Sequence, residues 1–232
     1  MDLAAAVDLS TDEGAFAVAE PTGRKVLFAR YQAMPGRAAA GLLPWLIETL
    51  AEHRLTLADI GEWTVGTGPG SFTGLRLAAA LVLGFGFGGG RTRIRGLPSA
   101  LGLALEAGFP AVGEVAVVYG GWRGEIIILT FTANQDQSGP GWTMDRKICV
   151  GTELEKLDAT RLPILLALEV QREPLTRAVS AALSGKIRFF PRLPIKNLLF
   201  ADYSNWARGT VANPEYIRPG VYIEPMTIRD VV

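Results

Sequence analysis

The chain has 232 residues, of which 49% are hydrophobic and 20% are charged. This composition is typical of a globular protein and excludes a largely disordered chain. The 23 lysines and arginines balance the 23 aspartates and glutamates, which disfavours a strongly basic nucleic-acid-binding protein and leaves open a local basic patch. The single cysteine, Cys149, excludes an internal disulfide and a zinc site built from several thiolates, and we expect it to be packed.

The first 30 residues predict a meander of three strands, over residues 3–7, 15–18 and 25–30. The first turn, residues 8–14, is acidic and rich in hydroxyl groups. No basic segment precedes the first strand, and the longest apolar stretch, 75–87, is too short to span a bilayer. We therefore expect a cytoplasmic protein without a signal peptide or membrane contact.

The next segment predicts a helix, a strand, a glycine-rich loop and a second helix. Leucine and isoleucine recur at helical spacing over 38–53, where Pro44 either begins the regular helix or kinks it. Residues 63–65 read as a strand, residues 66–74 as the glycine-rich loop, and residues 71–87 as a helix that later glycines end.

The densest basic stretch is Arg91-Thr92-Arg93-Ile94-Arg95. It suits either contacts to nucleic-acid phosphates or an edge strand with one solvated face. The zero net charge of the chain favours the edge strand.

Strands and weak helices alternate through the second half of the chain. Helices are expected at 99–107 and 197–208, and a hairpin-like turn at 120–124. Strands are expected at 115–119, 125–131, 144–150, 163–168 and 187–189.

The glycine-rich loop follows a strand and opens a helix. Its free amides and the helix dipole could hold an anion. The alternative is a tight turn in which Ser71 caps the helix and Gly74 allows close packing, and the local physics favours this structural reading. No Gly-Lys-Ser/Thr sequence follows, so the loop is not a nucleotide-binding Walker loop.

Two further polar residues invite a catalytic reading. Asp8 could orient a metal or a water, but a cap on the turn after the first strand is favoured because no second carboxylate is in view. His53 is the only histidine and closes the first helix, where a structural role is favoured over a metal site.

The sequence Gly66-Thr-Gly-Pro-Gly-Ser-Phe-Thr-Gly-Leu-Arg76 resembles the signature of the TsaB (YeaZ) family. That family is the non-catalytic partner of TsaD in making threonylcarbamoyladenosine in tRNA. Segments 6–11, 42–44, 55–60 and 213–218 also resemble the family. The resemblance implies an actin/sugar-kinase/Hsp70-like α/β fold of two ribonuclease-H-like lobes with mixed sheets.

A composition change near residue 97 predicts the lobe boundary. We expect an N-terminal lobe over 1–97 and a C-terminal lobe over 98–232, whose tail could pack back on the first lobe. Residues 132–195 receive no assigned role.

The resemblance also implies binding and activation of a TsaD-like protein through helices 38–53 and 71–88, with a TsaE-like ATPase joining the complex. The chain alone would be a homodimer, and it would meet tRNA only indirectly. No cofactor is assigned to it, and any ATP would lie at the interface of the complex. The expected interface residues are Leu42, Leu46, Leu50, Leu75, Ala79, Val82 and Leu83.

Asp8, Gly68, Pro69, Gly70, Ser71 and Gly74 are expected to shape the loop and its anion site. The second helix is apolar or small all round, which fits either burial within one chain or a partner face; the resemblance favours the partner. The substitution Val82→Arg is then expected to abolish partner binding and leave the monomer folded.

Two departures from the family pattern keep other functions open. The region around Ala38 has no histidine, and residues 120–125 read Gly-Gly-Trp-Arg-Gly-Glu where the family has Asp-Ala-Arg-x-Gly-Glu. One alternative is a small-molecule kinase or ATPase of the same fold that uses Asp8 and the glycine-rich loop. The other is a divergent homodimeric paralogue.

Overall fold

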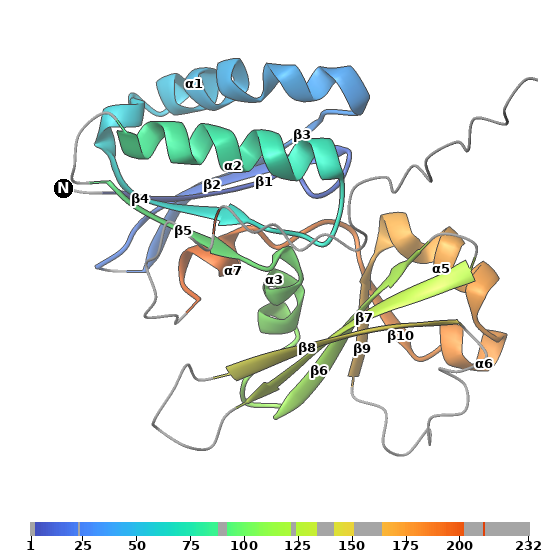
Figure 1. Ribbon diagram of the computed structural model, residues 1–232. Coiled ribbons are helices and arrows are strands. Elements are labelled where there is room, and N and C mark those ends of the chain that lie inside the picture. The colour runs from blue at the N-terminus through green and yellow to red at the C-terminus, as the bar shows by residue number, and fades with distance from the viewer. Residues whose placement is uncertain are drawn as a thin grey trace, which may run out of the picture.

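The computed structural model describes residues 3–22, 24–87, 92–121, 124–133, 142–150, 164–201 and 211. Two five-stranded mixed sheets, each flanked by helices, form two lobes (Figure 1). The strand orders are β3-β2-β1-β4-β5 in the first lobe and β10-β9-β6-β7-β8 in the second.

The first sheet is built from the meander and the two strands that follow it. Its strands are β1 (Leu3–Asp8), β2 (Glu13–Glu20), β3 (Lys25–Ala33), β4 (Ile60–Gly66) and β5 (Arg93–Leu97). β1 pairs antiparallel with β2 and parallel with β4. Every residue of β1 is buried because helices cover both faces of the sheet, and its alanines let those helices approach closely.

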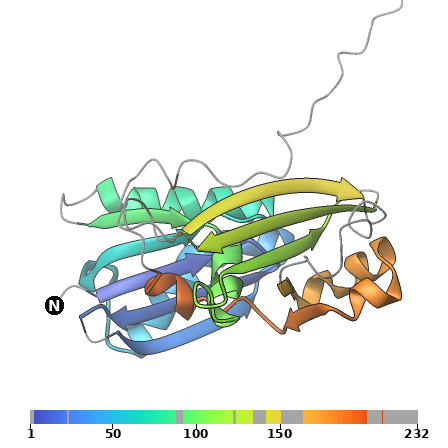
Figure 2. The same cartoon turned by 90° about the horizontal axis from the view of Figure 1, so that it is seen from below.

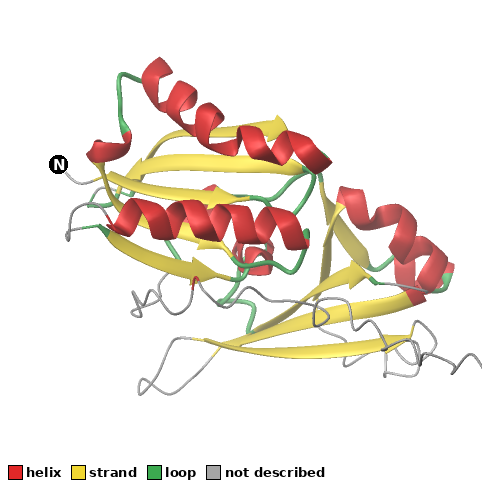
Figure 3. Ribbon diagram, turned by 45° about the horizontal axis from the view of Figure 1, so that its top comes forward, coloured by secondary structure: helices red, strands yellow, loops and turns green. Residues whose placement is uncertain are grey.

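The two longest helices, α1 (Leu42–Glu52) and α2 (Phe72–Phe87), lie side by side over one face of the first sheet (Figure 3). A short 3-10 helix, Gly36–Gly41, leads into α1, and Pro44 falls in the first turn of α1, where its missing N–H costs nothing. A second 3-10 helix, Leu57–Asp59, precedes β4.

Two short helices cover the opposite face of the first sheet. They are α3 (Ser99–Glu106) and α7 (Lys196–Leu199), and α7 contacts β1, β2 and β4. The helix predicted over 197–208 does not continue past Leu199, where α7 ends; residues 202–208 and the segment 213–218 lie outside the described residues.

The second sheet carries its own helices on the side away from the first lobe. Its strands are β6 (Glu114–Gly120), β7 (Glu125–Ala133), β8 (Trp142–Val150), β9 (Ile164–Leu168) and β10 (Ile187–Phe190). The 3-10 helix Glu169–Gln171 leads into α5 (Arg172–Ala178), which α6 (Ala181–Ser184) follows. Cys149 is buried in the apolar cluster between these helices and the sheet, as expected.

One apolar cluster joins the two lobes. It combines the alanines of β1 and β2 with α3, α7 and the inner face of β6, β7 and β9. A second cluster fills the space between the first sheet and the α1–α2 layer. Within the described residues, no helix is long and apolar enough to cross a bilayer.

Residues 93–95 of the basic stretch lie in an edge strand, β5, as predicted, but Arg95 is not solvated. Arg95 is only 3% exposed, because its side chain points at the end of α7. Its guanidinium donates hydrogen bonds to Thr64 Oγ1 (3.0 Å) and to the carbonyls of Ala201 (3.0 Å), Leu198 (3.2 Å) and Leu199 (3.3 Å). Arg95 thus caps α7 and fastens it to the first lobe.

Candidate functional site

The glycine-rich loop joins β4 to α2, and its backbone is hydrogen-bonded to two other segments. The amide of Thr67 donates to the Leu97 carbonyl (2.8 Å), and the amide of Ser71 donates to the Ser10 carbonyl (2.7 Å). The amide of Gly68 donates to Ser99 Oγ (2.9 Å). Three loop amides that an anion would need are therefore already used within the chain.

Close backbone contacts explain the glycines of this loop. A Cβ at Gly70 would overlap the carbonyl of Ser10, and a Cβ at Gly74 would overlap that of Leu9. Ser71 Oγ accepts a hydrogen bond from the amide of Gly74 (3.2 Å), as expected for a residue that caps α2. The contacts support the structural reading of the loop: it fixes where α2 begins and how it crosses the sheet.

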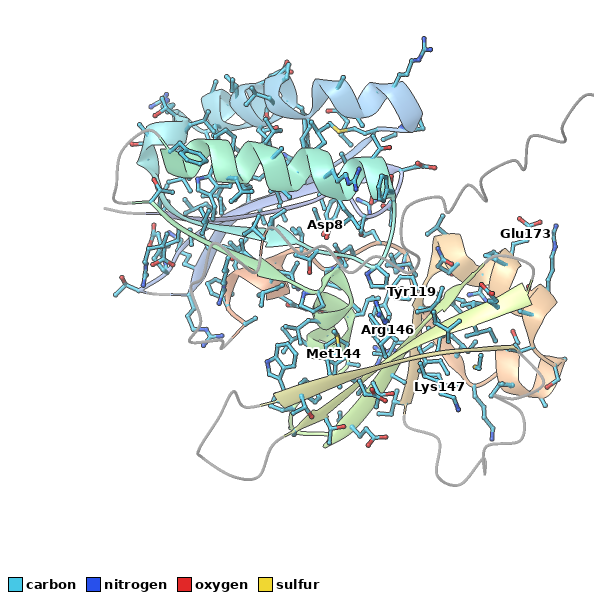
Figure 4. The ribbon with its side chains drawn as sticks, viewed as in Figure 1. Asp8, Tyr119, Met144, Arg146, Lys147 and Glu173 are labelled. Atoms are coloured by element: carbon cyan, nitrogen blue, oxygen red, sulfur yellow. The ribbon has the colours of Figure 1, made fainter. Side chains whose placement is uncertain are left out.

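Asp8 lies at the end of β1, beneath the glycine-rich loop (Figure 4). It is buried, and its Oδ1 accepts a hydrogen bond from the amide of Ser10 (2.7 Å), while its Oδ2 accepts a short one from Ser99 Oγ. A Cβ at Gly66 would overlap Oδ2. The favoured reading of Asp8 as a turn cap is confirmed, and the carboxylate also ties the β1–β2 turn to the start of α3.

Burial raises the pKa of Asp8, while hydrogen bonds from Ser10 and Ser99 lower it. Burial also raises the pKa of Tyr119, on β6 of the second lobe, and the negative charge of Asp8 raises it further. The carboxylate is thus buried and bonded within this chain, which suits a structural role.

A hollow of about 240 Å³ lies where the two lobes meet. The β1–β2 turn contributes Thr11, Asp12 and Glu13 to its wall, and the second lobe contributes Arg192 and Val170 among others. Another hollow, of about 390 Å³, lies beside the start of α2. Its lining residues are Leu9, Thr11, Asp12, Met34, Gly36, Arg37, Ala39, Ser71, Thr73 and Gly74.

The departure at the second-lobe turn has a steric counterpart. The amide of Gly120 donates to Gln171 Oε1 (3.0 Å), and a Cβ at Gly120 would overlap the side chain of Pro174. An aspartate at this position would therefore require α5 to move. Ala38 lies exposed in the 3-10 helix before α1, and residues 122–123 lie outside the described residues.

His53 lies at the C-terminal end of α1. Its ring stacks on Phe28, with ring centroids 4.1 Å apart, and Nε2 lies 3.5 Å from Arg30 Nη2. These contacts fit the structural role favoured for this histidine.

The seven residues expected to contact a partner lie inside this chain. Leu83 is partly buried, and the other six are buried: Leu42, Leu46, Leu50, Leu75, Ala79 and Val82. These side chains pack the two helices against the rest of the chain and do not form the outer surface of the helices. Val82 is 0% exposed, so the expectation that Val82→Arg leaves the monomer folded is wrong: an arginine there would place a charge in the core.

Other residues form the outer surface of the α1–α2 layer. Thr73 aside, the exposed positions on α2 are Phe72, Arg76, Ala80, Gly84 and Phe87, and on α1 they include Ile47. Phe87 is 81% exposed, Ile47 49% and Phe72 39%. We call these six residues the outer helical surface. The exposed residues of α2 recur every three or four positions in the sequence, and so do its buried residues. Because the helix is apolar on every side, the sequence does not tell the exposed side from the buried side.

Comparisons with known proteins match this architecture. Residues 37–141 match the family model TsaD, tRNA N6-adenosine threonylcarbamoyltransferase. The chain is 30% identical over 131 residues to the Mycobacterium tuberculosis protein Rv3421c and to a Mycobacterium bovis counterpart. It spans about three fifths (59%) of the length of these relatives.

Solved structures from Pseudomonas aeruginosa share the fold. An uncharacterized protein with similarity to peptidase YeaZ is 20% identical, with a TM-score of 0.67, and the match covers 94% of this chain and 100% of that one. YeaZ itself matches with the same identity and coverage and a TM-score of 0.64. The actin/sugar-kinase/Hsp70-like fold expected from the sequence is thereby confirmed. The chain is thus similar to the TsaD family model over residues 37–141 and shares its fold with YeaZ.

Proposed function

We propose that this chain is a non-catalytic, TsaB-like subunit that binds and activates a TsaD-type threonylcarbamoyltransferase in the modification of tRNA. The family match and the YeaZ fold support a TsaB-like role in tRNA modification. The binding surface that we assign to the partner is the outer helical surface.

The observation that carries the proposal is the apolar, small-residue character of the exposed side of α2. Ala80 and Gly84 lie between two exposed phenylalanines, and Arg76 is the one charged residue on this side of the helix. The guanidinium of Arg76 lies 3.6 Å from the ring centroid of Phe72. Large exposed apolar residues around small ones are typical of a surface on which another helix packs closely.

The contacts of Asp8 support a structural role over a kinase role. Both of its carboxylate oxygens accept hydrogen bonds from this chain, and the loop amides above it bond to the β1–β2 turn and to Ser99. A kinase of this fold would need that carboxylate to position metal and phosphate. The same contacts would instead hold α2 rigid for a partner.

Gly84 provides the test, because a Cβ built there meets no atom of the described residues within 4 Å. Gly84→Arg should leave the monomer folded and place a charge in the middle of the surface. We expect it to weaken binding to TsaD from the same organism by at least about 30-fold, the loss of one interface hot spot of roughly 2 kcal/mol. Ala182→Arg, at an exposed position on α6, is the matched control.

The measurement is size-exclusion chromatography with light scattering, followed by titration calorimetry, of each variant with TsaD. A folded Gly84→Arg protein that binds TsaD like wild type would overturn the assigned surface. A homodimer that TsaD does not dissociate would favour the divergent paralogue. Adding a TsaE-type ATPase with and without ATP tests for the larger assembly and for a nucleotide at its interface.

A further inference from the structure

The charges of the chain balance overall but not locally. The stretch from Pro174 to Ala201 contains no aspartate or glutamate. Its basic residues are Arg177, Lys186, Arg188, Arg192 and Lys196. A positive segment in a neutral chain is a candidate surface for a polyanion.

Three of these residues lie along the segment that connects the two lobes. Arg188, Arg192 and Lys196 are exposed and four residues apart, along the chain that leads from β10 in the second lobe to α7 in the first (Figure 2). Arg24 adds a fourth cation at the end of this segment, where its Nη2 donates to the Phe200 carbonyl (3.0 Å). We call these four residues the basic row.

Each arginine of the basic row lies over an aromatic ring. The guanidinium carbons of Arg188, Arg192 and Arg24 lie 4.9, 4.6 and 5.2 Å from ring centroids. The rings belong to Phe190, Tyr31 and Phe200. The hydroxyl of Tyr31 donates to the Leu193 carbonyl (2.8 Å), which fixes that ring in place. Rings held in this way limit the conformations of the guanidiniums above them, so less entropy is lost when a ligand binds.

Among the described residues, two carboxylates pair with cations of the row, both at long distance. Arg192 lies 3.8 Å from Glu13, and Lys196 lies 3.9 Å from Glu106, with both cationic side chains 52% exposed. Among the described residues, Arg188 has no carboxylate partner. Exposed ion pairs of this length contribute little, so a phosphate can replace them.

We propose that the basic row binds the sugar-phosphate backbone of RNA. Guanidiniums bind phosphate oxygens through paired N–H donors, and the side of a guanidinium facing away from its ring can also stack on an exposed base. The inference rests on the proposed function, which makes the RNA a tRNA, and it goes beyond the indirect contact with tRNA expected from the sequence.

The position of the row is compatible with a partner on the outer helical surface. α7 packs in the cluster on one face of the first sheet, and α1 and α2 pack in the cluster on the other. RNA on the basic row and TsaD on the helices would therefore occupy opposite faces of the first lobe and could bind together.

The test measures binding of an unmodified tRNA transcript to the full chain alone by fluorescence anisotropy, between 50 and 200 mM salt. The variant Arg188→Gln/Arg192→Gln/Lys196→Gln removes three cations. With a salt slope of about 0.7 per phosphate contact, the affinity at 0.1 M salt should fall on the order of 100-fold and the slope by about 2. Arg37→Gln/Arg54→Gln/Lys147→Gln removes three exposed cations elsewhere and should change affinity by less than about threefold.

The outcomes separate this inference from the proposed function. Equal losses in the two triple variants, or no binding by wild type, would overturn the basic row as an RNA site. Binding of heparin as tight as that of tRNA would overturn RNA in favour of polyanions in general. TsaD binding, measured on the same variants, should be unchanged. If the RNA experiment fails while TsaD binding is intact, the RNA-binding inference is overturned and the proposed function is not.

Discussion

Replacing Arg95 with methionine removes the cation that holds α7 on the first lobe and keeps most of the apolar stem. The carbonyls of Leu198, Leu199 and Ala201 would each lose a charged donor, as would the hydroxyl of Thr64. Arg95 is 3% exposed, so water cannot easily take its place. We expect this substitution to weaken the attachment of the whole segment between β10 and Ala201.

The magnitude follows from the hydrogen bonds and from burial. Hydrogen bonds to a charged group contribute about 1.5–3 kcal/mol each, so the three carbonyls together represent roughly 4.5–9 kcal/mol. Removing a buried guanidinium returns several kcal/mol of desolvation, so we expect a net loss of about 3–5 kcal/mol. For a chain of this size the loss corresponds to a fall in Tm of roughly 6–20 °C.

Urea unfolding followed by tryptophan fluorescence and circular dichroism measures this loss, since Trp63 and Trp142 report on different lobes. Arg93→Met is the matched control on the same strand. The side chain of Arg93 is 56% exposed and pairs with Glu62, whose side chain is 14% exposed, so the loss of Arg93 should cost about 1 kcal/mol. A loss for Arg95→Met within 1 kcal/mol of that for Arg93→Met would refute the capping role.

Two further predictions test the glycine-rich loop and the residue beneath it. Gly74→Ala places a Cβ against the Leu9 carbonyl and should destabilise the protein by about 1–3 kcal/mol, whereas Gly84→Ala in open space should stabilise it by roughly 0.5–1 kcal/mol; equal Tm values for the two would contradict the close contact. Because burial raises the pKa of Asp8, the folded state keeps its proton to a higher pH than the unfolded chain does, and wild type should lose stability relative to Asp8→Asn as pH rises through that pKa. Denaturation of both proteins between pH 3.5 and 8 checks this sign. The prediction is refuted if the free energy of unfolding of wild type minus that of Asp8→Asn is constant over this range or increases as pH rises.

The stretches expected to be strands are strands in the structure, because alternating and continuous apolar runs bounded by turn residues are local signals. The roles of the loop residues were also predicted from the sequence. Ser71 caps α2, and Gly74 allows the backbone of α2 to lie close to the backbone of Leu9. The end of α7 at Leu199 was not predicted, because the arginine that caps its carbonyls, Arg95, lies about 100 residues earlier in the chain.

What the sequence could not assign was the side of a helix that is apolar all round. Leu75, Ala79 and Val82 looked as available to a partner as Phe72, Ala80 and Gly84. Only the packing of α2 on β4 and beside α1 decided that the first three are core and the others surface. The same holds for the arginines: Arg95 is buried and Arg188 exposed, although both lie on edge strands. The sequence by itself determined the order and kind of the elements, because those depend on neighbours along the chain; which face meets the core, and which charge meets solvent, depends on segments far apart in sequence, and only the tertiary structure decided it.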